Sequence, residues 1–417
     1  MEKSGKFRLT SLERNWILYD VGNSAFVLMV ATLIPIFFNA LAAAGGLSSV
    51  EYLAYWGYAS SAVTIITAVL SPILGTVADT KGFKKPIFIL CVFVGIVGCC
   101  AMGAVSAWLP FLVIFVIAKV GFSGSLVFYD SMLSDVTTPE RMDEVSSRGY
   151  AWGYIGSCVP FVVCLGLVLG AGSIGISQMT ALNLALLLTA AWWLLTTLPL
   201  LKSYKQLYYV EVEKHAVRQS FVRIGHTLRH LPEDKQVFWF LLAFFCYIDG
   251  VYTIIDMATA YGTALGLDTT GLLLALLVTQ IVAFPSALVF GRLSNKYPSA
   301  KLIPVCIAAY AGIAVFAFFL TRQWQFWVLA VIVGMFQGGV QALSRSHFAK
   351  IIPPEKSGEY FCLFDICGKG ASFLGTMIVS VGSQLTGSAN VGVGSLILLF
   401  IVGFVLFRVS CRQGETA

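Results

Sequence analysis

The chain has 417 residues, of which 58% are hydrophobic and 12% charged, and its formal net charge is +6. A soluble domain of ordinary composition carries about 25% charged residues. The chain therefore has too little polar surface to cover a water-soluble globule, and none of its polar segments could fold alone. No DNA- or RNA-binding pattern accompanies the positive charge. These features predict a single integral membrane domain and exclude nucleic acid as a partner.

Twelve apolar segments have the length of a membrane-spanning helix, which is about 20 residues. The first follows a polar N-terminus, exceeds a signal-peptide core in length and has no evident cleavage site, so we expect it to be retained. The predicted fold is all-α, with spans near 16–42, 52–78, 86–106, 109–136, 147–171, 178–201, 236–262, 269–291, 301–320, 324–347, 359–384 and 391–408.

Basic residues are distributed unequally between the two sides of these spans. Of the 27 Lys and Arg residues, all but three fall in loops and ends on one side, and only Arg322 falls on the other. Cytoplasmic loops are enriched in Lys and Arg, so both termini are predicted to be cytoplasmic. The remaining two, Lys119 and Lys369, lie within spans.

The longest polar segment, 202–235, separates the sixth span from the seventh. We therefore predict two six-helix bundles, 1–201 and 236–417, joined by a cytoplasmic linker. Apolar residues recur at helical spacing over 217–231 with arginines between them, which predicts a basic amphipathic helix on the membrane surface. Such helices can also be calmodulin targets.

The two predicted bundles share sequence landmarks. The loop at 75–85 corresponds to 291–296 at an offset of 216 residues, and the turn at 138–141 corresponds to 353–356 at an offset of 215. Two landmarks at nearly one offset indicate a duplicated six-span unit. Halves of this kind hold substrate at their interface near the membrane midplane and rock to alternate access.

The loop at 75–85 resembles the cytoplasmic signature of the major facilitator superfamily. The matching residues are Gly75, Asp79, Gly82, Lys84 and Lys85, while Thr80 and Phe83 stand where basic residues are usual. An acid here can accept hydrogen bonds from the N-terminus of a neighbouring helix and pair with a loop cation. We therefore expect Asp79 to hold the cytoplasmic side shut in one state, the alternative being a solvated turn.

Three further segments, 18–26, 247–254 and 338–346, resemble the autophagy-related vacuolar effluxer-like branch of that superfamily. Val21-Gly22 is a departure, because the branch usually has Trp-Ala there. The resemblance implies a secondary transporter, and amino-acid export from vacuoles has been proposed for eukaryotic relatives. It also implies that the chain is not an enzyme.

Ionisable residues deep in spans are costly, and each is a functional candidate. Lys119 is near the midplane and has no acid three or four residues away, so its partner should be another helix or the ligand. Lys369 has Asp365 at i−4 and can form a structural ion pair or bind substrate. Asp249 is deep in the seventh span, and Asp256 lies on much the same face nearer the outside.

A second group of polar residues completes the candidate site. Asp20 and Asp130 lie nearer the cytoplasmic ends of their spans, where we expect a gate or, for Asp20, coupling. The remaining candidates are Asn23, Tyr129, Gln280, Gln337 and Gln341 for binding or coupling, and Arg345 for the gate, with inter-helix hydrogen bonding as the alternative for each amide.

Together these residues predict a secondary transporter for a small anionic or zwitterionic solute, amino-acid-like or an organic anion. We expect the solute to bind near Lys119, Asp249 and Lys369, with protons as the coupling ion. The alternative is a multidrug, amphiphile or lysolipid exporter, because one fold hosts many substrates. We further expect a monomer in the bacterial cytoplasmic (inner) membrane.

Other chemistries have weaker support in the sequence. Gly121-Phe-Ser123-Gly124 fits the motif of intramembrane serine proteases, but none of the four histidines is placed to serve as the base, so close helix packing is the better explanation. No P-loop is present, which argues against a built-in ATPase. The ten cysteines form no CxxC pair, so we expect apolar filler and no metal or other cofactor.

Overall fold

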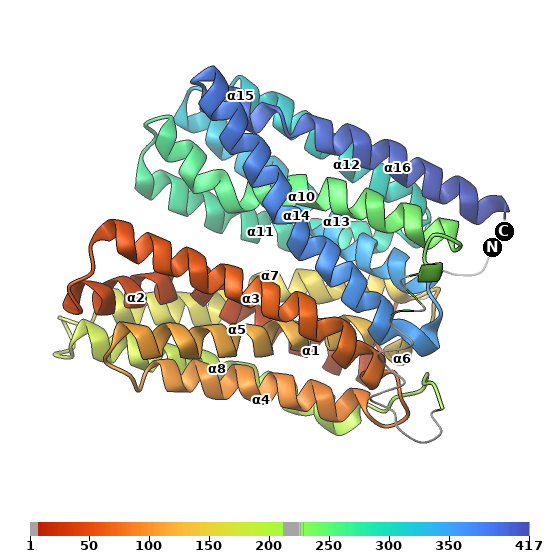
Figure 1. The fold of residues 1–417 in the computed structure, drawn as a ribbon, viewed down its shortest axis with the longest axis horizontal. Helices are drawn as coiled ribbons and strands as arrows, with labels where there is room; N and C mark the ends of the chain where they lie inside the picture. The colour runs from red at the N-terminus through yellow and green to blue at the C-terminus, as the bar shows by residue number, and fades with distance from the viewer. Residues whose placement is uncertain (1–6, 212–224, 226, 228, 417) are drawn as a thin grey trace.

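The computed structural model describes residues 7–211, 225, 227 and 229–416. Within them, twelve helical segments are long and apolar enough to cross a membrane, which confirms the predicted all-α fold. The helices form two layers, one from each half of the chain, lying side by side with their long axes roughly aligned (Figure 1). Helix α1 begins and α16 ends at the same end of the molecule, which we call the terminal end (Figure 1).

The N-terminal half supplies the first six of these segments. Its helices are α1 (Ser11–Ala31), α2 (Leu33–Ala44), α3 (Ser49–Ala78), α4 (Lys84–Met102), α5 (Trp108–Ser131), α6 (Leu133–Val136), α7 (Met142–Leu169) and α8 (Gln178–Ser203). The first span consists of α1 and α2 together, interrupted at Thr32. Pro35 lacks an N–H group and cannot continue the hydrogen bonding of α1, which accounts for a break at this place.

The C-terminal half supplies the other six. Its helices are α10 (Lys235–Ala264), α11 (Thr269–Leu293), α12 (Ser299–Phe318), α13 (Gln323–Ile351), the 3₁₀ turn η1 (Pro354–Lys356), α14 (Ser357–Thr386), α15 (Ala389–Gly394) and α16 (Ile397–Thr416). Most of the amphipathic helix predicted over 217–231 lies outside the described residues.

Local sequence signals define several helix ends. Thr10 and Glu13 form a capping box at the start of α1, and Ser48 and Glu51 form another at the start of α3. Asp268 accepts the Gly271 N–H at the start of α11. Each cap satisfies N–H groups that have no partner within the helix.

Glycines allow close packing inside the N-terminal half. A Cβ on Gly121 would stand 2.7 Å from the Gly95 backbone nitrogen and 2.8 Å from the Cys91 carbonyl oxygen. Helices α4 and α5 therefore approach each other through their backbones, as expected from small residues at helix interfaces. This supports the packing explanation of the Gly121–Gly124 motif over the protease.

The halves meet through α7 with α11 and α13, and through α14 with α3 and α5. Helix α14 runs obliquely across its own half, from the N-terminal layer at the terminal end to α15 at the opposite end (Figure 1). It thus touches both halves.

Candidate functional site

Polar contacts between the halves gather at the terminal end. Among the described residues, the hydrogen bonds and ion pairs that join the two halves use the parts of α1, α3, α5, α7, α11, α13 and α14 nearer that end, or the loops there. The structure is therefore closed at the terminal end.

Asp79 caps the first turn of α14 from the opposite half. One carboxylate oxygen accepts the Gly358 N–H at 2.7 Å and the other accepts the Glu359 N–H at 2.8 Å. The side chain of Asp79 is fully buried, and the ammonium of Lys84 lies 3.8 Å away. The contacts predicted for this acid, with a helix N-terminus and a loop cation, are thus present.

Two glycines make this approach possible. A Cβ on Gly75 would stand 2.6 Å from the Gly358 carbonyl oxygen, and a Cβ on Gly358 would stand 2.7 Å from both the Gly75 carbonyl oxygen and Asp79 Oδ1. Any side chain at either position would push α3 and α14 apart and lengthen the hydrogen bonds to Asp79.

The charges around Asp79 form a buried cluster that spans both halves. Lys84 Nζ donates to Ser357 Oγ at 2.8 Å and to Asp135 Oδ2 at 3.4 Å. Tyr204 donates its hydroxyl to the same Asp135 oxygen at 2.6 Å. Burial, reinforced by Asp135, raises the pKa of Tyr204, so this hydroxyl stays a donor.

Burial also raises the pKa of Asp79 to about 7, against the lowering effect of Lys84 and of the two N–H donors, and with a further raising effect from Glu359. Protonation of this buried contact is therefore within reach at neutral pH.

The second half presents a related contact to the first. Asn295, the counterpart of Asp79 in the repeat, donates to Glu144 Oε2 at 2.6 Å, at the start of α7. Next to it, Asp143 accepts from Ser346 at 2.6 Å and pairs with Lys350 at 2.7 Å. Both loops of the duplicated unit therefore engage the helix start of the opposite half.

Arg345 forms the central ion pair of the closed end. Its guanidinium donates to Asp130 at 2.9 Å and to the Ser146 hydroxyl and carbonyl at 2.9 and 3.0 Å, and Asp20 lies 3.9 Å away. Arg345 and Asp130 are 215 residues apart, which is the repeat offset. The two partners thus occupy corresponding positions in the two halves.

Aromatic rings enclose the Arg345 guanidinium. Its central carbon lies 4.7, 5.5 and 4.3 Å from the ring centroids of Trp16, Tyr129 and Tyr150. Trp16 and Tyr129 stack at 4.3 Å. Cation–π attraction adds to the ion pair here, and the structure places Tyr129 in this enclosure.

Further from the terminal end lies a second group of predicted charges, Lys119, Asp256, Asp365 and Lys369. Lys119 of α5 is half-buried, with Nζ 4.7 Å from the Phe122 ring centroid, and forms no ion pair within 4 Å with any described residue. Lys369 of α14 and Asp256 of α10 are the charges that act on it electrostatically. The side chain of Asp256 is exposed, whereas that of Lys119 is half-buried.

Lys369 pairs with Asp365 at 2.6 Å, and their side chains are 28% and 18% exposed. The predicted i,i+4 pair is therefore formed. It leaves Lys119 as the lysine in this group whose charge no acid neutralises by direct contact among the described residues.

Asp249 is placed differently from Asp256. It is fully buried in the C-terminal half, where Oδ1 accepts the Gly375 N–H of α14 at 2.9 Å and the Thr253 hydroxyl at 3.3 Å. Asp256, and not Asp249, is thus the α10 acid that acts on Lys119.

The predicted amides fall into three environments. Asn23 donates to Asp20 and to its own helix, and Gln341 accepts from Tyr154 of the opposite half at 2.8 Å. Gln280 and Gln337 instead line a cavity of about 60 Å³ within the C-terminal half. The amides therefore do not form one cluster.

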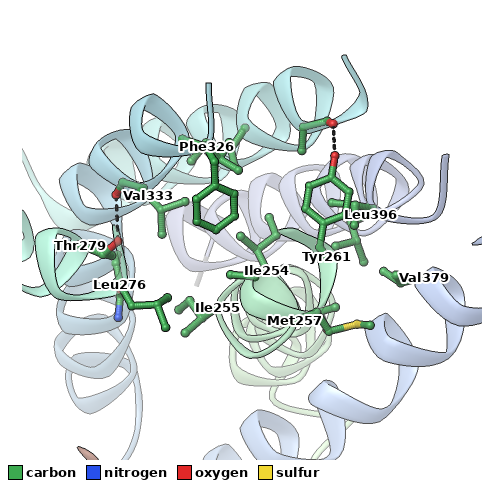
Figure 2. Close-up of a pocket in the computed structure, with 18 of the residues that line it drawn as sticks. Ile254, Ile255, Met257, Tyr261, Leu276, Thr279, Phe326, Val333, Val379 and Leu396 are labelled. Atoms are coloured by element: carbon green, nitrogen blue, oxygen red, sulfur yellow. Dashed lines mark hydrogen bonds between the residues drawn. The ribbon is translucent and has the colours of Figure 1, made fainter. Parts of the chain in front are cut away.

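Figure 2 shows this cavity, which residues of α10 to α15 and Leu396 line, mainly with hydrocarbon side chains such as Ile254, Phe326 and Val333. Its polar groups Thr279 and Tyr261 donate to backbone carbonyls, as the dashed lines show (Figure 2). Gln337 Oε1 is buried and has no hydrogen-bond partner among the described residues.

Several residues of the closed end are not predictable from the sequence patterns considered above, or only through the repeat. Asp143 and Glu144 follow the 138–141 landmark as Gly358 and Glu359 follow the 353–356 landmark, so the repeat could have indicated them. Trp16, Tyr150 and Ser146 carried no such signal, because their roles depend on how the two halves dock.

Comparison with known proteins identifies the family. The family model described as "Vacuole effluxer Atg22 like" matches residues 11–416. The chain belongs to this family. It is 42% identical over 414 residues to the uncharacterized MFS-type transporter YxiO of Bacillus subtilis, covering 98% of this chain and 97% of the relative.

A fungal member of the family, autophagy-related protein 22 of Coccidioides immitis, is 26% identical over 315 residues, covering 65% of this chain but 51% of that protein. The chain thus matches about half the length of this fungal relative.

Solved structures show the same fold. The human organic anion transporter MFSD10 has a TM-score of 0.72 at 14% identity, covering 95% of this chain and 99% of that one. The MFS transporter FucP, in an outward conformation, has a TM-score of 0.72 at 16% identity, covering 96% and 97%. The family match and the 42% identity to YxiO, together with this shared fold, make the Atg22-like chain a multi-pass major facilitator superfamily transporter in a lipid environment, and not an enzyme.

Proposed function

We propose that this transporter carries a small anionic or zwitterionic solute by alternating access, with protons as the coupling ion. The observation that carries the proposal is Lys119, a half-buried lysine between the halves with no ion pair among the described residues. A buried cation without a counter-charge is costly, and an acidic group of the solute supplies that charge.

The second lysine makes the site responsive to conformation. Lys119 belongs to α5 of the first half and Lys369 to α14 of the second. A carboxylate held between them bridges the halves, and an amine on a zwitterion has Asp256 as its partner. Movement of one half relative to the other separates these groups and releases the solute.

The distribution of Lys and Arg supports cytoplasmic termini, and with them a place in the cytoplasmic membrane of a bacterium. The closed terminal end is then the cytoplasmic gate, held by Asp79, Asp130 and Arg345, with Asp20 beside them. In this orientation the state described here has its binding region shut off from the cytoplasm.

Counterflow in proteoliposomes tests the proposal. Vesicles loaded with unlabelled leucine, glutamate or succinate are assayed for uptake of the same labelled compound, with wild type, Lys119→Ala and the exposed-loop control Lys296→Ala. We expect counterflow of at least one acid, loss with Lys119→Ala and no change with Lys296→Ala. Counterflow equal in wild type and Lys119→Ala would overturn the role of the lysine.

The apolar cavity in the C-terminal half favours a second candidate, export of an amphiphile or lysolipid. Its lining, largely hydrocarbon, suits an acyl chain better than a carboxylate. Transport of lysophosphatidylcholine but of none of the three acids would favour this candidate. No flux of any compound that binds would contradict transport itself.

A further inference from the structure

Asp249 is a buried carboxylate with one oxygen satisfied and the other not. Its exposed fraction is 0%, and both recorded donors, the Gly375 N–H and the Thr253 hydroxyl, point to Oδ1. Oδ2 is buried and has no hydrogen-bond partner among the described residues. An acceptor left in this condition costs about 1–3 kcal/mol, and more when charged.

The charged groups on the surrounding helices are engaged elsewhere. On α14, Lys369 binds Asp365, and on α13, Arg345 binds Asp130 while Lys350 binds Asp143. On α16, Arg408 packs on the Phe404 ring. Within the described chain, therefore, no cation pairs with Asp249.

A proton resolves this arrangement better than a counter-ion. An ionised carboxylate in a dry interior is penalised by several kcal/mol unless it is paired. A proton on Oδ2 makes the group neutral and leaves Oδ1 as the acceptor for Gly375 and Thr253. Both recorded hydrogen bonds, to Oδ1, remain possible in the protonated acid.

The adjoining cavity offers this proton a path. The Thr253 hydroxyl donates to Asp249, and Thr253 also lines the cavity of about 60 Å³. Gln337 lines the same cavity, and its Oε1 has no hydrogen-bond partner among the described residues. A cavity needs about 10–15 Å³ to hold one water molecule, together with polar partners. The volume of the cavity suffices for water, and the Thr253 hydroxyl and Gln337 Oε1 are polar groups of this largely hydrocarbon lining that would bind it beside the buried acid.

The contact with Gly375 connects Asp249 to the rest of the transporter. Gly375 lies six residues beyond Lys369 on α14, whose first turn is capped by Asp79 of the other half. A Cβ at Gly375 would stand 2.6 Å from Asp249 Oδ1, so this close approach requires glycine. Loss of the proton places a negative charge against the middle of α14, on the helix that carries both a binding lysine and the gate contact.

We propose that Asp249 is the proton-binding residue of the transport cycle, and that it acts through Gly375 on the position of α14. This proposal rests on the proton-coupled transport proposed above. The proton binds in the closed-end state. Its release leaves an unpaired buried charge at Asp249, and the movement of α14 that brings water to this charge shifts Lys369 and weakens the gate. Asp256 and Asp365 are assigned no part in proton binding, since Asp256 is exposed and Asp365 is paired with Lys369.

Infrared spectroscopy tests proton binding without any substrate. Spectra of the purified transporter near pH 6 should contain the C=O band of a buried protonated carboxyl, which Asp249→Asn removes. The matched control is Asp268→Asn, an exposed acid whose cap on α11 an asparagine can maintain, and it should keep the band. A wild type without this band, or a band that survives Asp249→Asn, overturns the proposal.

Transport then separates this proposal from the function on which it rests. With one proton per solute, wild type should accumulate the solute about tenfold per unit of pH gradient. Asp249→Asn should keep counterflow and lose this accumulation, while Asp268→Asn keeps both. Accumulation that persists in Asp249→Asn overturns the proton site, whereas a wild type without counterflow of any acid overturns the proposed function and leaves the infrared result standing.

Discussion

Replacement of Asp79 by alanine tests the closed end directly. The substitution removes the acceptor of two buried N–H groups, those of Gly358 and Glu359. Each unsatisfied buried donor costs about 1–3 kcal/mol, so the closed state loses about 2–6 kcal/mol. Lys84 keeps Asp135 and Ser357 as partners, and hence is not left unpaired. Since 1.4 kcal/mol is tenfold in an equilibrium constant, the ratio of closed to open molecules should fall at least about tenfold.

Hydrogen–deuterium exchange in nanodiscs near pH 8 measures this change. We expect faster exchange of the Gly358 and Glu359 amides in Asp79→Ala than in wild type. Asn295→Ala is the matched control, because its hydrogen bond to Glu144 occupies the corresponding place in the repeat and leaves these two amides capped. Unchanged exchange in Asp79→Ala, or an equal effect of Asn295→Ala on these amides, would refute the reasoning.

Three further predictions concern pH, packing and the gate. Burial raises the pKa of Asp79 to about 7 in the closed state, against about 3.9 in water. The ratio of closed to open molecules should therefore rise about tenfold from pH 8 to pH 6; this gain is fully developed near pH 4 and is lost as pH rises through 7. The same exchange assay checks the sign, with Asp79→Asn as a control that should show no such pH dependence. Gly121→Ala should lower the melting temperature in detergent because its Cβ meets backbone of α4, whereas Gly166→Ala meets nothing within 4 Å and should be neutral or stabilising. Arg345→Lys should weaken the closed end by about 1–3 kcal/mol, since an ammonium cannot make all the guanidinium hydrogen bonds; exchange at 143–150 equal to wild type would contradict this.

Much of the architecture followed from the sequence for physical reasons. Spans are recognisable because the bilayer imposes a minimum apolar length, and the offset of about 215 residues revealed the duplication. The Asp79 contact was predictable because an acid in a short interhelical loop has a helix N-terminus as its natural partner. The Lys369–Asp365 pair followed from helical spacing alone.

The grouping of the charges deep in the spans could not be predicted from the sequence. Helical spacing put Asp249 and Asp256 on much the same face of α10, yet the structure directs Asp249 to Gly375 and leaves Asp256 exposed beside Lys119. The difference depends on where α14 crosses α10, which no local pattern encodes. The aromatic enclosure of Arg345 depends in the same way on docking of the halves.

The central claim is that Lys119 binds an acidic group of the solute. The most direct measurement is the affinity of the transported acid and of its methyl ester, on wild type and on Lys119→Met. The claim predicts that esterification weakens binding to wild type at least about tenfold, as expected for a lost charge-assisted contact, and has little further effect on Lys119→Met. Equal affinities of acid and ester on wild type, or fully additive losses in the variant, would contradict it.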